Sequence, residues 1–185
     1  IWNRVRNYSN FIIDGEVFVS GNDPWYHVRS TEYVVQNYPE TMPFEPFTNF
    51  PQGTFVSQFG TLYDQIVATI ALVVGLGAPD IYTTRLVLLL SPALFGALVC
   101  VPLFYMGRRV GGKFGGITAV AFVALAPDRF LQVSLAGSVE HNPIEVVLMS
   151  LTILGMMVAL TAAEREKPVV ELLEDREFKA VRGTF

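Results

Sequence analysis

The stretch Leu135–Glu145, LAGSVEHNPIE, gathers two glutamates, a histidine and an asparagine between two strongly apolar segments. VVLMSLTILGMMVALTAA follows it at Val146–Ala163, and GGITAVAFVALAP precedes it at Gly115–Pro127. Counted from Pro143, the downstream segment has about 20 residues, enough for a helix to cross a hydrocarbon core of about 30 Å. Ionisable side chains at the entrance to such a helix mark either a simple helix start or a functional site.

The composition indicates a membrane protein. The chain has 185 residues, of which 51% are hydrophobic and 16% are charged, and its mean hydropathy is +0.41. Soluble globular proteins carry about 25% charged residues, and here the charges are sparse from Leu62 to Ala163. A net charge of −4 provides no basic surface for nucleic acid, so that class of partner is excluded. The single cysteine, Cys100, excludes an intrachain disulfide.

The apolar segments predict an all-α, polytopic membrane protein with roughly four spans. The candidate spans are Leu62–Gly77, which is short or tilted, Ile81–Met106, Phe114–Pro127, which is marginal in length, and Pro143–Ala163. Residues 1–60 are polar, aromatic and rich in proline, which predicts a first external loop that contains short helices. Residues 61–163 then form the membrane region, with a second external loop at 128–142.

The short basic loop MGRRVGGKFGG at Met106–Gly116 sets the expected orientation. It holds three basic residues and no acidic one, which is typical of a cytoplasmic loop. Residues 1–60 and 128–142 are then expected to share the external face. Residues 164–185 carry charges of both signs and are expected to form a cytoplasmic loop or an amphipathic surface helix.

The polar residues of the second external loop stand where a helix is expected to begin. Asn142 is a good N-cap and Pro143 suits the first helical position. Glu140 and His141 would then lie at a helix N-terminus, where free N–H groups and the macrodipole favour anions such as phosphate. Glu145 follows His141 by four residues and would lie beside it. The alternative is an ordinary helix start at the membrane surface.

A second polar cluster, GNDPWYHVR at Gly21–Arg29, lies in the first external loop and offers Asp23, His27 and Arg29. The alternative here is a turn at Asn-Asp-Pro with Trp25 and Tyr26 as interfacial anchors. The stretch HVRSTEYVVQNY, which begins at His27, has the spacing of a helix, with Ser30 or Thr31 as its expected cap. Because both clusters are expected on one face, we interpret them as parts of one site. Carboxylate and amide oxygens suit Mg²⁺ or Mn²⁺ better than zinc.

Three stretches together resemble the catalytic subunit of the oligosaccharyltransferases, the STT3/AglB/PglB family, and most of all its archaeal AglB members. GNDPWYHVR resembles the family's first acidic motif, and FPQGTFVSQFGTLYD at Phe50–Asp64 resembles the stretch that leads into the next span. FLQVSLAGSVEHNPIE at Phe130–Glu145 resembles the second acidic motif, FLxRSxxGxxDHHxxE in archaeal members. The resemblance runs over essentially the whole chain and identifies it as an N-terminal fragment.

This resemblance implies roles for individual residues. Asp23 and Glu140 would be catalytic, and the divalent metal would be held by Asp23, Glu140 and Asn142. His141 would contact the lipid phosphate. Arg129 would replace the motif's arginine, since Val133 stands in its position, provided that this segment is helical. Supporting roles would fall to His27, Arg29 and Glu145.

The implied protein is a glycosyltransferase of the GT-C type in the cell membrane, multi-pass, with an external catalytic face. It would transfer an oligosaccharide from a dolichol phosphate or diphosphate carrier to asparagine in N-x-S/T sequons of acceptor polypeptides. The family's WWDYG motif is absent from these 185 residues, so we expect the fragment alone to be inactive. Two alternatives stay open: another GT-C enzyme, such as a protein O-mannosyltransferase, or a non-catalytic membrane scaffold or transporter fragment.

Overall fold

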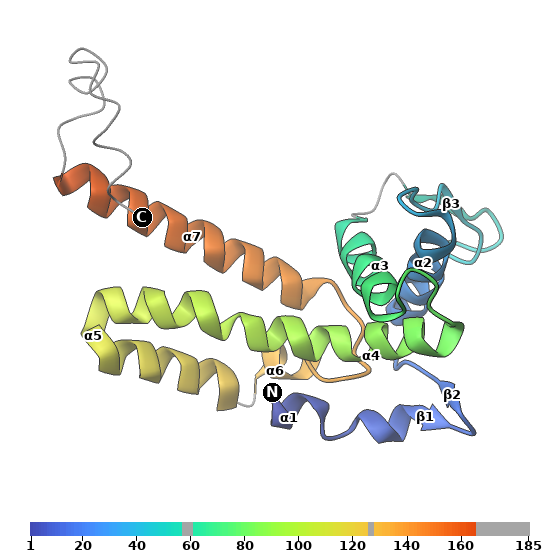
Figure 1. Ribbon diagram of the computed structural model, residues 1–185, viewed down its shortest axis with the longest axis horizontal. Coiled ribbons are helices and arrows are strands. Elements are labelled where there is room, and N and C mark those ends of the chain that lie inside the picture. Colours follow the sequence, from blue (N-terminus) through green and yellow to red (C-terminus); the bar gives the residue numbers. More distant parts are fainter. Residues whose placement is uncertain (57–60, 126–127, 166–185) are drawn as a thin grey trace, which may run out of the picture.

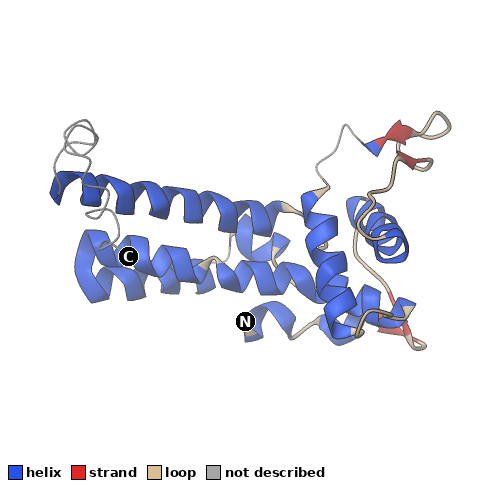
Figure 2. Cartoon of the chain, turned by 45° about the horizontal axis from the view of Figure 1, so that its top comes forward, coloured by secondary structure: helices blue, strands red, loops and turns tan. Residues whose placement is uncertain are grey.

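The computed structural model describes residues 1–56, 61–125 and 128–165, which form a mainly helical protein (Figure 1). Helix α4 (Ile81–Leu98) continues into α5 (Cys100–Leu125), and α7 (Asn142–Arg165) packs along both. The shorter elements gather at the end where α4 and α7 begin (Figure 2). The expected all-α class is confirmed. The prediction for residues 164–185 concerns residues that lie almost wholly outside the described part of the chain, which ends with α7 at Arg165.

The strands form two small antiparallel ribbons. In the first, β1 (Ile12–Ile13) pairs with β2 (Glu16–Val17) around a turn in which Asp14 and Gly15 have φ of 51° and 82°. Positive φ at both central residues is the geometry of a tight hairpin turn that matches strand twist. The remaining short elements of this polar region are α1 (Trp2–Val5), the 3₁₀ helix η1 (Tyr8–Phe11), β3 (Phe44–Glu45) and β4 (Thr54–Phe55).

Helix α2 spans Asp23–Asn37 and begins earlier than the predicted caps allow. Ser30 and Thr31 are buried in the middle of the helix, so the prediction that either caps it is wrong. The Asn-Asp-Pro sequence starts the helix instead of forming a separate turn. Pro24 stands in the first turn, where its fixed φ suits a helix and its missing N–H costs nothing.

Helix α3 (Leu62–Val74) occupies the segment predicted as a short or tilted span, and it is shorter than the helices that are long enough to cross a membrane. Its 13 residues reach only about 20 Å at 1.5 Å per residue. The chain then turns back through Leu76 and Gly77, with φ of 53° and 91°, and α3 packs against α2 and α4. An apolar segment therefore serves as a core helix of the polar region.

Two stretches among the described residues are long and apolar enough to cross a membrane, Ile81–Leu125 and Asn142–Thr161. The first reverses direction at Gly111 and Gly112, where φ of Gly112 is 63° (Figure 1). The arms of this hairpin approach closely, because a Cβ on Gly107 would lie 2.6 Å from the carbonyl oxygen of Gly115. Such glycine contacts are typical of helix packing in membranes.

The apolar core joins the polar region to the spans. It consists of Val28, Tyr63, Val67, Leu88, Phe95, Val139 and Ile144. These residues come from α2, α3, α4, the loop before α7 and the start of α7. The core therefore lies beneath the two polar clusters and fixes the helices that carry them.

Candidate functional site

The first polar cluster begins helix α2. Asp23 is the first residue of the helix, and the carbonyl of Asn22 accepts a hydrogen bond from the Trp25 N–H at 3.1 Å. The Asp23 carboxylate is exposed and makes no hydrogen bond or ion pair within the part of the chain that the structure describes. Asp23 therefore presents an accessible carboxylate at the start of the helix.

The second polar cluster begins helix α7. The carbonyl of His141 accepts hydrogen bonds from the N–H groups of Ile144 and Glu145, at 3.1 and 3.2 Å, so the helix is entered one residue earlier than predicted. The Asn142 amide does not cap the helix, because its Nδ2 donates to Glu140 Oε2 at 2.5 Å. His141 Nε2 lies 3.7 Å from Glu145 Oε1, as their spacing predicts.

The structure brings the two clusters together at one end of the molecule. The Ser20 N–H donates to the Gly137 carbonyl at 3.1 Å, which joins the segment before α2 to the loop before α7. The rings of His27 and His141 contact each other edge to face, with centroids 5.7 Å apart and planes at 60°. Two segments far apart in the sequence thus adjoin, as a shared site requires.

A buried arginine holds the second loop in place. Arg4 is 2% exposed, and its Nε donates to Ser134 Oγ at 2.8 Å while its Nη2 donates to the Val123 carbonyl at 2.9 Å. The Arg4 carbonyl accepts from the Ala136 N–H at 2.8 Å. Burial lowers the pKa of Arg4, yet a guanidinium is so strongly basic that it stays charged. These contacts were not predicted, since only the fold brings Arg4 to this loop.

Gly137 belongs to the same loop and is also closely held. Its φ is 93°, its N–H donates to the Leu89 carbonyl at 3.1 Å, and a Cβ there would lie 2.4 Å from the Phe11 ring. Only glycine combines this left-handed conformation with such a close approach. Gly137, three residues before Glu140, is therefore held in place by helix α4 and by Phe11.

The sequence prediction gave no role to Asp64, although it stands out as an acid in an apolar helix. Asp64 is fully buried, and its Oδ1 lies 2.7 Å from Nδ1 of His27, which is itself 4% exposed. The neighbouring Tyr63 hydroxyl lies 2.7 Å from Ser91 Oγ on α4. Burial raises the pKa of Tyr63, and burial with the nearby Asp64 raises the pKa of Tyr26 to about 12. Both phenols therefore stay neutral, as hydrogen-bonding groups.

Of the predicted site residues, Arg29 has a partner outside the two polar clusters, and Arg129 has no partner among the described residues. Arg29 Nε donates to Glu45 Oε2 at 2.8 Å, and its guanidinium lies 5.0 Å from the Phe47 ring centroid. These contacts organise the first loop. Arg129 begins the short helix α6 (Arg129–Val133), so the segment is helical as its proposed role requires. Its side chain is exposed and makes no hydrogen bond or ion pair among the described residues, and Val133 is buried.

The region where the two polar clusters meet, called the junction below, offers oxygen atoms of the kinds that bind hard divalent cations. Asp23 and Glu140 supply carboxylates and Asn142 an amide, the donor types that Mg²⁺ and Mn²⁺ prefer. Glu140 Oε2 accepts the Asn142 hydrogen bond, while its Oε1 is a second possible ligand atom. Over residues 1–56, 61–125 and 128–165, no group of three or more His, Cys, Asp and Glu side chains is arranged to hold a metal. The three side chains are thus of suitable donor types, but the described residues alone assemble no metal site.

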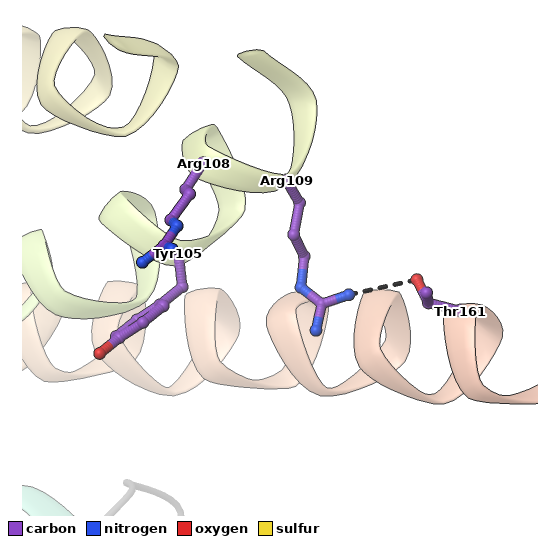
Figure 3. A pocket seen from close by; sticks show the side chains of 4 residues that line it. All are labelled: Tyr105, Arg108, Arg109 and Thr161. Atoms are coloured by element: carbon purple, nitrogen blue, oxygen red, sulfur yellow. Dashed lines mark hydrogen bonds between the residues drawn. The ribbon is translucent and has the colours of Figure 1, made fainter. Parts of the chain in front are cut away.

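A separate cavity lies at the hairpin end, away from both clusters. It has a volume of about 410 Å³ and is lined by Tyr105, Arg108 and Arg109 of α5 and Thr161 of α7 (Figure 3). Arg109 Nη1 donates to Thr161 Oγ1 at 3.2 Å, which ties the hairpin to α7. Its basic lining agrees with the sequence of a cytoplasmic loop, and it takes no part in the candidate site.

Comparison with known proteins shows one consistent similarity. The chain matches a family model described as "Oligosaccharyl transferase STT3, N-terminal" over residues 3–173. It is 50% identical, over 98% of its length, to the dolichyl-monophosphooligosaccharide–protein glycotransferase AglB of Haloferax volcanii, and covers 17% of that protein.

Two solved structures of the Archaeoglobus fulgidus oligosaccharyltransferase have the same fold. One is AglB in complex with an inhibitory peptide and a dolichol-phosphate, with a TM-score of 0.73 and 28% identity over 97% of this chain and 20% of that one. The other is a complex with zinc and sulfate, with a TM-score of 0.71 and 29% identity over 90% of this chain and 20% of that one. The chain thus spans about a fifth or less of these relatives.

Proposed function

Because the chain belongs to the STT3 family of oligosaccharyl transferases, we propose that it is the N-terminal part of the catalytic subunit of an oligosaccharyltransferase. The whole protein transfers an oligosaccharide from a dolichol-phosphate-type carrier to the asparagine of N-x-S/T sequons. The observation that carries this proposal is the junction of the two acid-bearing loops. The Ser20–Gly137 hydrogen bond and the His27–His141 ring contact support it directly.

The carboxylates of the junction carry the chemistry. Amide nitrogen is a poor nucleophile, so the acceptor asparagine must be held in a productive orientation. Asp23 is exposed at the first turn of α2 and accepts a hydrogen bond from the acceptor amide N–H. Asp23, Glu140 and Asn142 would hold a divalent cation, Mg²⁺ or Mn²⁺. When bound, the cation neutralises charge on the phosphate leaving group and fixes its geometry.

The start of α7 binds the phosphate of the lipid carrier. The helix dipole favours an anion at this end, and His141 lies there with its side chain half exposed. The relative from Haloferax volcanii is named for a monophosphate-linked oligosaccharide, which supports a dolichol monophosphate as the carrier. Glu145 orients His141 from one turn further along the helix.

The site faces the outside of a multi-pass membrane protein. The polar residues 1–56 gather at one end of the spans, and the basic hairpin with Arg108, Arg109 and Lys113 lies at the other (Figure 1). Positive loops remain in the cytoplasm, so the two acidic clusters lie on the external face. This orientation is the one that lipid-linked donors exposed outside the cytoplasm require.

Transfer to a sequon peptide tests the proposal. The full-length protein, supplied with dolichol-monophosphate-linked oligosaccharide and Mg²⁺ or Mn²⁺, should glycosylate a peptide containing Asn-Val-Thr and leave Gln-Val-Thr unmodified. Chelation with EDTA should stop the reaction and either cation should restore it. Asp23→Ala and Glu140→Ala should each abolish transfer, because each removes a charged ligand at the junction.

Asp14→Asn is the matched control, since Asp14 is an exposed acid of the same loop region in a turn that asparagine tolerates. It should keep wild-type transfer. Activity at the wild-type level in either junction variant would remove the site from this proposal, and transfer that persists in EDTA would remove the metal.

A further inference from the structure

His27 and Asp64 form a buried polar pair between α2 and α3. His27 Nδ1 lies 2.7 Å from Asp64 Oδ1, and the two side chains are 5% and 0% exposed. Because a carboxylate only accepts hydrogen bonds, Nδ1 carries the hydrogen and donates it to Asp64. The bond therefore fixes both the tautomer and the orientation of the ring.

The ring that Asp64 holds lies next to both acidic clusters. On α2, His27 is one helical turn after Asp23, so the two side chains share a face of the helix. Its other neighbours are His141, at 5.7 Å between ring centroids, and Tyr63, at 4.8 Å. One imidazole thus contacts the start of α7 while it belongs to the helix that presents Asp23.

Packing alone gives no reason for an acid at position 64. A buried ionisable pair is often no more stable than well-packed apolar residues of the same size. Asp64 Oδ2 also has no hydrogen-bond partner among the described residues, which adds a desolvation cost. Side chains that orient a ligand-binding histidine through its second nitrogen are a known reason to retain such a carboxylate.

We propose that Asp64 is a positioning residue, which holds the His27 ring so that this ring supports His141 and aligns the first turn of α2 with the second acidic loop. This inference rests on the proposed function, because it assigns the supported groups to carrier binding and transfer. Asp64 itself touches neither substrate nor cation. Its removal should therefore weaken use of the lipid donor more than it weakens the fold.

Arg29 and Glu45 provide a matched control pair. Arg29 lies on the same helix two residues after His27, and Glu45 is as buried as Asp64, with a distance of 2.8 Å between Nε and Oε2. Glu45 Oε1 also accepts the Phe47 N–H at 2.8 Å, so this pair ties α2 to β3 and the loop after it. Loss of Glu45 should disturb the first loop without moving His141.

The experiment compares near-isosteric apolar and amide variants in the full-length protein: Asp64→Leu, Asp64→Asn, Glu45→Met and Glu45→Gln. The first readout is KM for the lipid-linked donor and kcat for transfer. The second is hydrogen–deuterium exchange of residues 137–145 without donor or cation, which needs no activity. Asp64→Leu should raise KM by about tenfold or more and increase exchange in 137–145. Asp64→Asn retains an acceptor for Nδ1 and should stay close to wild type in both readouts.

Glu45→Met should leave KM and the exchange of 137–145 unchanged. Equal effects of Asp64→Leu and Glu45→Met on both readouts would overturn the proposal, as would an Asp64→Asn variant as damaged as Asp64→Leu. If Asp64→Leu does not fold, the double variant His27→Phe/Asp64→Leu replaces the pair by apolar groups of similar size. Raised KM in this folded variant supports positioning, whereas wild-type KM and exchange refute it.

Failure of this inference differs visibly from failure of the proposed function. If Asp23→Ala abolishes transfer but Asp64→Leu behaves like wild type, only the positioning role is lost. If Asp23→Ala transfers normally, the proposed site is wrong, while the exchange of 137–145 still reports whether Asp64 holds the second loop.

Discussion

The two ends of the helical spans are built differently. At the junction end, Arg4, Ser20, Gly137 and Leu89 are joined by specific hydrogen bonds, and polar side chains such as Asp64 are fully buried. At the hairpin end, Arg109 makes one hydrogen bond to α7, and Val110 and Phe114 are 84% and 83% exposed. One end therefore holds its side chains through several specific contacts, whereas the other relies on the close packing of its helices and on one hydrogen bond to α7.

This difference matches the roles proposed for the two ends. The proposed site requires ligands held in place before the substrate arrives. The proposed cytoplasmic loop needs only its positive charge, and the exposed apolar residues beside it suit contact with lipid or with other parts of the protein. Substitutions at the two ends should therefore differ in their effects even where the residue type is the same.

The largest effect is expected at Gly137. Gly137→Val forces a β-branched residue to φ of 93° and drives a Cβ into the Phe11 ring, 2.4 Å away. Backbone strain of about 1–3 kcal/mol adds to about 1–3 kcal/mol of overpacking. Thermal unfolding of the full-length protein should show the loss of stability, and transfer should fall because the loop before Glu140 moves.

Gly15→Val separates these two causes. Gly15 has a similar φ of 82°, but a Cβ there meets no atom within 4 Å. It should show only the strain and retain transfer. Equal destabilisation by both variants would mean that the contact with Phe11 does not fix the second loop.

A smaller effect is expected at the hairpin end. Gly107→Val places side-chain atoms against the Gly115 carbonyl oxygen and Ala119 Cβ, which lie 2.6 and 2.9 Å from the Cβ position. The arms must separate, at a cost of about 1–3 kcal/mol, without backbone strain from a positive φ. Thermal unfolding should show this loss, whereas KM for the donor should stay near wild type because the junction is remote.

Gly155→Val in α7 is the control, since a Cβ at Gly155 meets no atom within 4 Å. A change in KM as large as that of Gly137→Val would contradict the separation of the two ends. No loss of stability in Gly107→Val would contradict the close contact of the arms.

The sequence was sufficient to predict the helical class, the longest spans and the two polar clusters. These features depend on local properties: the length of an apolar run and the charge of a short loop. The segment of helix α3 was interpreted as a short or tilted span because an apolar run has the same composition in a membrane and in a core. Its packing against α2 and α4, which favours a core helix, becomes visible only in the structure.

The contacts that build the junction could not be predicted, because each joins residues distant in the sequence. Arg4 reaches Ser134 and His27 reaches Asp64 only when the helices are assembled. One signal was present: Asp64 is an acid in an otherwise apolar helix, and such residues are costly unless they have a partner. His27, one of the two histidines, was the reasonable partner to consider.

The smallest expected effect lies at the start of α4. Asp80 Oδ1 accepts the Thr83 N–H at 2.7 Å, and these hydrogen bonds to Thr83 lower the pKa of Asp80 below its ordinary 3.8. The lowered pKa means that the ionised cap stabilises the folded state above pH 3.8, and that this contribution disappears as the pH falls through the lowered value.

Asp80→Ala should therefore speed amide exchange in the first turn of α4 at neutral pH by less than about tenfold. Asp80→Asn retains an accepting oxygen and should slow that exchange again without the acid dependence. Helix α4 also supplies the Leu89 carbonyl to the second loop, through a hydrogen bond further along the helix. Amide exchange at Gly137 should nevertheless stay unchanged in both Asp80 variants. If it changes, the start of α4 and the junction are coupled, and the stability of the site does not depend on its own contacts alone.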